Sequence, residues 1–151
     1  MTSPPKELIT NIVDQKARAN PDALYAKYPI SDWSYDEGYF GVTRGDLANA
    51  VNGAAWWLHN TLGPGTNFET IAYIGPNDLS VAAHLSLFDH LKCNIIISPD
   101  PQPAATGAIL AERPMRVEYV PSVDDLLQKS YSKFPYEKNF KEAGSEPLVA
   151  M

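Results

Sequence analysis

The sequence has a single cysteine, no excess of basic residues and no long apolar run. Cys93 stands alone, which excludes an internal disulfide and favours a reducing compartment. The 12 Lys and Arg residues against 18 Asp and Glu give a net charge of -6, which disfavours nucleic acid as a partner. No apolar run reaches membrane-spanning length, and the N-terminus does not resemble a signal peptide. We therefore expect a cytoplasmic chain with neither a nucleic-acid nor a membrane partner.

What is present is an ordinary globular composition. The chain has 151 residues, of which 44% are hydrophobic and 20% charged, and this length suits one domain around one core. Apolar residues recur at helical spacing in some stretches and form short buried-type runs in others. Helices are expected at residues 8–20, 43–62 and 79–92, in an Ala-rich stretch ending near residue 112, and just after Ser122. Strands are expected at residues 70–75, 93–98 and 115–120.

Local signals mark several ends of these elements. Thr43 and Asp46 have the spacing of a capping box at the start of the long helix, and Ser122 with Asp125 repeats it. Aromatic residues at 23–43 surround a turn at 36–38, which predicts a hairpin. Residues 130–146 lack periodicity and are expected to form a surface loop. The alternation of strands and helices predicts an α/β fold with a partial parallel sheet flanked by helices.

A phosphate-binding loop is the first kind of site to consider. The Gly-Pro-Gly-Thr stretch at residues 63–66 is the only candidate, since such loops present consecutive backbone amides and usually a Lys. Its proline removes one donor, no Lys follows, and it comes after a predicted helix instead of before one. We therefore interpret this stretch as a helix stop.

Histidines and paired acids also occur where structural roles are common. His59 lies near the end of the long predicted helix, where a capping role is favoured. His84 and His90 are six residues apart and point to different faces of one helix, which argues against a metal pair. The adjacent acids at 36–37 and 124–125 lie on a turn and a helix start, so solvation or dipole stabilisation explains them.

Two aromatic residues and the lone thiol complete the candidates. Trp56 and Trp57 are neighbours on a predicted helix and point about 100° apart, so at most one indole faces fully inward. Packing explains them better than ligand stacking. Cys93 adjoins an isoleucine run and is expected to act as a small buried hydrophobe. The residues themselves thus predict no catalytic, cofactor-binding or metal-binding side chain.

Three stretches nevertheless carry a resemblance that covers almost the whole chain. They are residues 42–58 (VTRGDLANAVNGAAWWL), 68–79 (FETIAYIGPNDL) and 133–140 (KFPYEKNF). The sequence resembles the N-terminal part of the adenylation, or AMP-binding, domain of fungal nonribosomal-peptide-synthetase-like (NRPS-like) and adenylate-forming reductase enzymes. The last stretch is similar to the segment that precedes the phosphate loop in that family. The resemblance implies the N-terminal subdomain of the adenylate-forming, acyl-CoA synthetase-like fold.

The resemblance also implies a reaction in fungal secondary metabolism. Such domains use ATP and Mg to activate a carboxylic acid to an acyl-AMP, then transfer it to a phosphopantetheine thiol on a carrier domain. In the family the phosphate loop would follow residues 148–150, so the resemblance implies a single truncated subdomain over residues 1–151. We expect it to hold no cofactor and to be inactive alone. The family also has about twenty more residues where Leu79 and Ser80 adjoin here, enough for a strand and a crossover helix.

Two other functions fit parts of the sequence. The chain could be a non-catalytic interaction module that pairs with the rest of an adenylation domain or with a homologous protein, through the sheet surface left uncovered. A flavodoxin-like or receiver domain fits the alternation of elements alone. It is disfavoured because the predicted strand ends carry no acidic cluster or phosphate loop.

Overall fold

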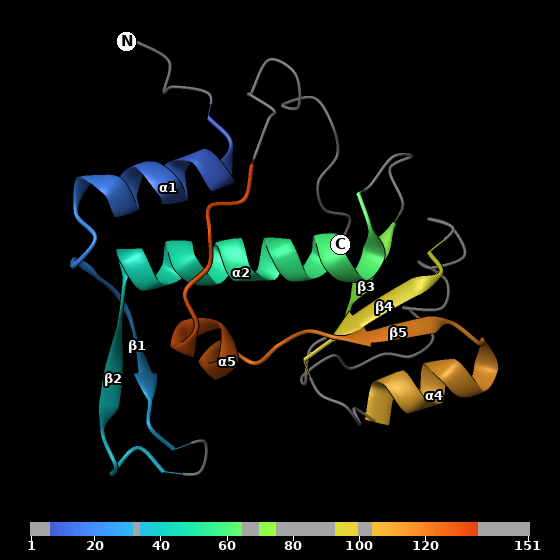
Figure 1. The fold of residues 1–151 in the computed structure, drawn as a ribbon. Helices are drawn as coiled ribbons and strands as arrows, with labels where there is room; N and C mark the ends of the chain where they lie inside the picture. The colour runs from blue at the N-terminus through green and yellow to red at the C-terminus, as the bar shows by residue number, and fades with distance from the viewer. Residues whose placement is uncertain (1–6, 32–33, 65–69, 75–92, 100–103, 136–151) are drawn as a thin grey trace, which may run out of the picture. The chain divides into compact units, whose positions relative to one another are not determined.

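The computed structural model describes residues 7–31, 34–64, 70–74, 93–99 and 104–135 (Figure 1). The chain divides into two compact units. Unit 1 comprises Met1–Gly53 and Leu127–Met151, and unit 2 comprises Ala54–Leu126. The boundaries fall inside helices α2 (Arg44–Leu62) and α5 (Val123–Gln128), so both helices contribute residues to each unit. Unit 1 is therefore built from two stretches of chain that are far apart in sequence.

Unit 1 begins with helix α1 (Ile9–Ala19), as the spacing of apolar residues predicts. The helix ends before Pro21, because the residue preceding a proline disfavours helical geometry. The chain then reaches α2, whose first turn is closed by the predicted capping box. The Thr43 hydroxyl accepts a bond from the Asp46 N–H (3.1 Å), and the Asp46 carboxylate accepts one from the Thr43 N–H (2.9 Å). These reciprocal bonds satisfy donors that a helix start would otherwise leave unpaired.

Between α1 and α2 lies the predicted hairpin. Strand β1 (Leu24–Pro29) pairs antiparallel with β2 (Tyr39–Thr43), with a register shift between Leu24 and Ala26. The Gly38 N–H donates to the Tyr35 carbonyl (3.2 Å), and Gly38 has a φ of 86° that favours glycine. The Tyr28 and Phe40 rings stack across the two strands, with centroids 5.9 Å apart.

Unit 2 contains a three-stranded parallel sheet in the order β3–β4–β5. The strands are β3 (Ile71–Tyr73), β4 (Ile95–Ser98) and β5 (Arg116–Tyr119), and helix α4 (Ala104–Glu112) connects the last two. In register, Ala72, Ile96 and Val117 lie side by side on one face of the sheet. The predicted helix at 79–92 lies outside the described residues. The parallel and antiparallel sheets confirm the expected α/β class.

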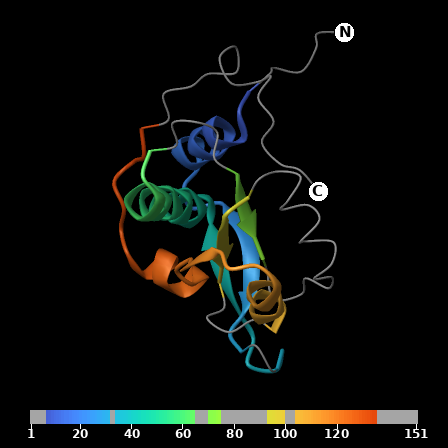
Figure 2. The same ribbon diagram turned by 90° about the vertical axis from the view of Figure 1, so that its right-hand side faces the viewer.

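The core of unit 2 forms where α4 packs on that sheet face (Figure 2). Ile74, Cys93, Ile96 and Ile109 are fully buried, and Ala72, Met115 and Val117 pack against them. The buried Ser98 hydroxyl donates to the Ile74 carbonyl (3.0 Å) and so keeps a polar group satisfied inside the apolar layer. Within the described residues, no helix is both long and apolar enough to cross a bilayer.

Candidate functional site

The candidate reactive side chains that the structure describes lie in the core or on helix α2, at positions with a packing or helix-end role. Cys93 is fully buried, and its thiol lies 3.3 Å from the Ile95 carbonyl, in agreement with its expected packing role. His59 lies exposed in the last turn of α2, where its ring meets Trp56 edge-on at a centroid distance of 5.8 Å. Trp56 and Trp57 are both partly buried. His84 and His90 lie outside the described residues.

The predicted helix stop is also present. The α2 helix ends at Leu62, Gly63 has a φ of 85°, and its N–H donates to the His59 carbonyl (2.9 Å). This is the glycine-terminated end expected of a helix C-terminus, so the start of the Gly-Pro-Gly stretch serves as a cap. Arg116 of β5 adds a bond to the Thr61 carbonyl (2.8 Å) at the same helix end. Gly65 and Thr66 lie outside the described residues.

The paired acids lie on the turn and helix start that the sequence predicts. Asp36 and Glu37 are exposed in the hairpin turn. Asp124 and Asp125 lie in the first turn of α5, and the Asp125 carboxylate accepts a bond from the Ser122 hydroxyl (2.7 Å). In the part of the chain that the structure describes, no three His, Cys, Asp or Glu side chains come together as a metal site would require.

The most elaborate polar arrangement lies in unit 1 and involves helix α2. We call residues 129–135 the return segment, because they bring the chain back to α2 after unit 2. We call Asn49, Asn52 and Gly53 the clamp. These three residues follow an i, i+3, i+4 spacing, so they lie on one face of the helix. The clamp holds the return segment chiefly by its backbone.

Asn49 forms two hydrogen bonds to the return segment. Its side-chain amide donates to the Lys129 carbonyl (2.7 Å), and its side-chain oxygen accepts from the Tyr131 N–H (2.9 Å). One side chain thus satisfies a backbone acceptor and a backbone donor two residues apart. A segment without helix or strand structure leaves such groups unpaired unless side chains or water bind them.

Asn52 extends the arrangement one helical turn further. Its side-chain oxygen accepts from the Phe134 N–H (2.8 Å), while its amide donates to the Ala48 carbonyl in the same helix (2.7 Å). The bond to Ala48 fixes the orientation of the Asn52 side chain. This buried side chain is therefore set in place to receive the return segment.

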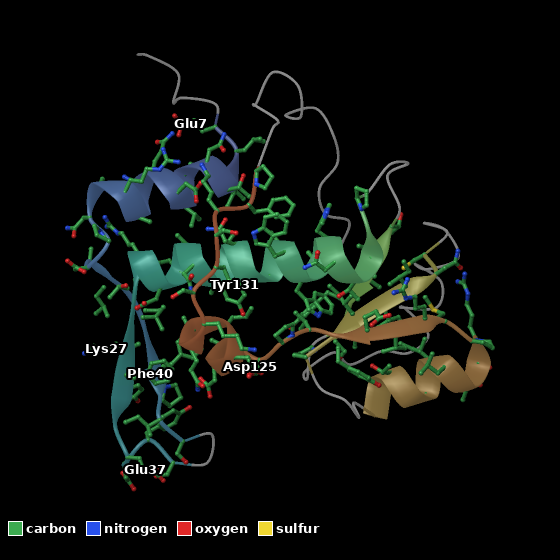
Figure 3. The ribbon with its side chains drawn as sticks, in the orientation of Figure 1. Glu7, Lys27, Glu37, Phe40, Asp125 and Tyr131 are labelled. Atoms are coloured by element: carbon green, nitrogen blue, oxygen red, sulfur yellow. The ribbon has the colours of Figure 1, made fainter. Side chains whose placement is uncertain are left out.

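Gly53 completes the clamp by having no side chain. The ring of Tyr131 lies against α2 (Figure 3), and a Cβ atom at Gly53 would come within 2.5 Å of that ring. Real Cβ atoms do not approach other atoms so closely, so any larger residue would displace the tyrosine. The close approach of ring and helix backbone requires glycine at this position.

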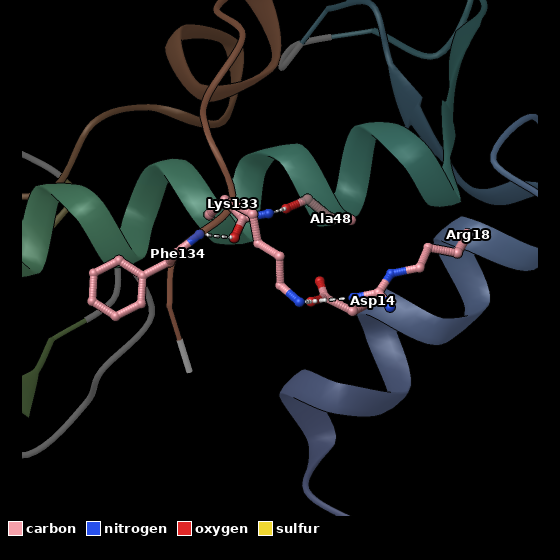
Figure 4. Close-up of polar contacts among 6 residues, drawn as sticks. Asp14, Arg18, Ala48, Lys133 and Phe134 are labelled. Atoms are coloured by element: carbon pink, nitrogen blue, oxygen red, sulfur yellow. Dashed lines mark hydrogen bonds and ion pairs between the residues drawn. The ribbon is translucent and has the colours of Figure 1, made fainter. Parts of the chain in front are cut away.

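An ion pair connects the return segment to α1. The Lys133 ammonium lies 3.0 Å from the Asp14 carboxylate, which is also 3.7 Å from the Arg18 guanidinium (Figure 4). The Asp14 side chain is only 12% exposed, whereas both cations are mostly exposed. The return segment is thereby bound to α1 as well as to α2.

The clamp and return segment hold a chain in place through backbone hydrogen bonds, a close ring contact and an ion pair. Sequence reasoning missed this arrangement, although the Asn-x-x-Asn-Gly spacing on one helix face was visible. Asn and Gly residues have poor helix propensity, so their presence in the middle of a helix was the one signal in the sequence that these positions bind something. The partner backbone lies 80 and 82 residues away from the asparagines, which no local pattern reveals.

Comparison with known proteins finds fungal relatives, and two of them are described here. The chain is 29% identical to the isocyanide synthase-NRPS hybrid crmA of Aspergillus fumigatus, over 95% of this chain and 11% of the relative. It is 28% identical to a carboxylic acid reductase of Neurospora crassa, over 97% of this chain and 16% of the relative. No protein-family model matches. The chain therefore spans less than a fifth of either relative.

Both alignments are longer than the chain, at 170 and 172 positions against 151 residues. Each relative thus has residues without a counterpart in this chain, and the missing stretch of about twenty residues that the resemblance implies stays a prediction. The predicted position of that gap, between Leu79 and Ser80, lies outside the described residues. The expected resemblance to fungal NRPS-like and reductase enzymes is confirmed, and the chain is a homologue of an NRPS hybrid and a carboxylic acid reductase over nearly its whole length.

Proposed function

We propose that this chain forms the N-terminal scaffold of an adenylate-forming domain and does not make an acyl-AMP by itself. The homology to two large multifunctional fungal enzymes over 95% and 97% of the chain carries the proposal. ATP, Mg and the phosphopantetheine thiol belong, on this proposal, to the parts of such an enzyme that these residues do not represent. The fold would then be the N-terminal subdomain of the adenylate-forming fold.

The described side chains support a scaffolding task. The polar groups of the clamp bind backbone, and the buried hydroxyl of Ser98 bonds within the sheet of unit 2. The best-organised contacts hold the return segment, whose last residues, 133–135, begin the stretch similar to the family's approach to its phosphate loop. A domain that handles ATP needs that approach to be fixed, because misplaced groups lose much of their effect on a transition state.

Calorimetry with ATP and Mg²⁺ tests the proposal on the 151-residue chain. We expect no heat of binding at micromolar nucleotide, with circular dichroism on the same sample showing that the chain is folded. Exchange of labelled pyrophosphate into ATP, measured with a panel of carboxylic acids, should stay at the level of a blank without protein. Micromolar ATP binding or acid-dependent exchange by the folded chain would overturn the proposal.

A second function, an interaction module that pairs with an adenylation protein, is favoured by one observation. Ile71 and Tyr73 of the edge strand β3 point to the same sheet face and are 39% and 59% exposed. Parallel sheets usually have both faces covered, so an open apolar strand is a candidate contact surface. The partner would be the remainder of an adenylation domain or a homologous chain.

Substitution at this strand separates the two functions. If the surface binds a partner, Tyr73→Glu should abolish co-elution with a separately produced adenylation protein in gel filtration. Tyr119→Glu, on the opposite face of the same sheet and 47% exposed, should leave co-elution intact. Absence of co-elution for the unmodified chain removes the interaction-module function and leaves the scaffold.

A further inference from the structure

We infer that Asn49, Asn52 and Gly53 are positioning residues, which fix the path and the register of the return segment on helix α2. The inference rests on the proposed scaffold function, because it concerns what that scaffold must hold. It adds to that function the residues that hold the return segment. None of the three is expected to touch substrate.

The clamp binds backbone groups, which are found in every peptide. The two asparagines bind one carbonyl and two N–H groups of the return segment, at Lys129, Tyr131 and Phe134. Backbone groups have fixed spacing along the chain, so three such bonds determine both the direction and the register of the segment. A slip by one residue would place each asparagine opposite the wrong backbone group.

Two side-chain contacts remove the remaining freedom of the return segment. The Tyr131 ring fits only over a residue without Cβ, which locks this residue opposite Gly53. Lys133 pairs with Asp14 at 3.0 Å and so ties the segment to α1 as well as to α2. The return segment is thus held at five points within seven residues, although it has no helix or strand structure of its own.

The residue types of the clamp lower the stability of the helix that carries them. Asparagine and glycine in the middle of a helix are each less favourable than alanine, and α2 has all three clamp residues within five positions. The Asn52 side chain is also buried, which disfavours a polar group unless it is bonded. A helix needed only for packing would do better with alanine or leucine here. The binding of the return segment therefore explains why these residue types are present in α2.

Amide hydrogen exchange on the intact 151-residue chain tests the inference directly. In the unmodified chain, the Tyr131 and Phe134 amides should exchange more slowly than in a synthetic peptide of residues 127–137. Asn49→Leu keeps the side-chain volume but removes both bonds, and should speed exchange at Tyr131 by about two- to tenfold. Asn52→Leu should act in the same way on Phe134. Asn60→Ala, an exposed site on the same helix, should change neither amide.

A conservative substitution distinguishes positioning from general stability. Asn49→Asp keeps the oxygen that accepts the Tyr131 N–H, so this amide should stay more protected than in Asn49→Leu, even where both variants unfold at the same temperature. Trypsin gives a second reading, since Lys129 and Lys133 lie within the return segment. Cleavage there should be faster in both leucine variants than in the unmodified chain.

The outcomes separate this inference from the proposed function. Fast exchange at Tyr131 and Phe134 in the unmodified chain would overturn the inference about the clamp. It would not affect the proposal that the chain does not make an acyl-AMP by itself. Equal loss of protection at both amides in every variant would show a purely structural role and would also overturn it. ATP binding by the chain would remove the proposed function, yet the exchange result would still show whether the clamp holds.

Discussion

At the scale of single residues, the contact between Gly53 and Tyr131 shows how one missing side chain organises its surroundings. The tyrosine ring occupies the space that a Cβ would need, at 2.5 to 2.8 Å. The contact buries an aromatic ring against helix backbone, where tight packing contributes dispersion energy. The residue that determines the contact is therefore the one with no side chain atoms.

Gly53→Ala should destabilise the chain by about 1–3 kcal/mol, because the added methyl group forces the ring away. Urea unfolding followed by circular dichroism measures the change. Gly107→Ala is the matched control, since nothing lies within 4 Å of a Cβ there and α4 should gain stability from the better helix former. A double variant, Gly53→Ala with Tyr131→Ala, should have nearly the same free energy of unfolding as Tyr131→Ala alone, because the methyl group then meets no ring. A cost of Gly53→Ala that persists without the ring would contradict the steric explanation.

The pair between Asp14 and Lys133 belongs to the same scale and is expected to be weak. Lys133 is 56% exposed, so solvent screens the attraction and the coupling should not exceed about 1 kcal/mol. A double-mutant cycle with Asp14→Asn and Lys133→Met, measured at low and at high salt, gives this coupling. It should shrink as salt rises, and a coupling that is independent of salt would contradict an ionic origin.

At the scale of secondary-structure elements, helix starts are the features that the sequence predicts best. Both expected capping boxes are present, at Thr43 with Asp46 and at Ser122 with Asp125. In each, the hydroxyl accepts the N–H of the acid three residues later, at 3.1 Å. The α2 box is partly buried and reciprocal, whereas the α5 box is exposed. The two boxes therefore offer a comparison of the same chemistry in two settings.

Thr43→Ala should lower the free energy of unfolding by about 0.5–2 kcal/mol through loss of the α2 cap. Ser122→Ala should cost less, because solvent replaces the lost bond at the exposed box and α5 is only six residues long. Thermal and urea unfolding of the two variants, side by side with the unmodified chain, provide the test. A larger effect for Ser122→Ala would show that burial does not govern these caps.

Periodicity and turn residues accounted for much of the remaining secondary structure. The hairpin, the three strands of the parallel sheet and helices α1, α2, α4 and α5 lie where apolar spacing places them, within a few residues. These elements are encoded locally, so a reader of the sequence finds them. The clamp is encoded by residues about 80 positions apart, and the bulge between Leu24 and Ala26 depends on strand pairing. Such features have no local signature.

At the scale of the whole molecule, the described core belongs to one of the two units. Ile74, Cys93, Ile96 and Ile109 are fully buried in unit 2, whereas Val42 is the buried apolar side chain described in unit 1. Unit 1 depends more on polar bonds, between its clamp and its return segment. The described residues of each unit are therefore stabilised by a different kind of interaction.

Ile96→Ala should destabilise the chain by about 2–5 kcal/mol, since it leaves a cavity at a fully buried position. Val123→Ala, at a site that is 47% exposed, should stay within about 0.5 kcal/mol. Equilibrium unfolding in urea measures both variants. Comparable small effects at the two sites would show that the α4 and sheet contacts do not form a tightly packed core.

The separation between Asn52 and Phe134 also bears on how the chain is made. Synthesis adds about 5–20 residues each second, so the 82 residues between these partners take roughly 4–16 s to emerge. Throughout that time the clamp of α2 has been translated and has nothing to hold. Unit 1 therefore stays incomplete until after the last residue of unit 2 has been made, because it needs the residues from Leu127 onward.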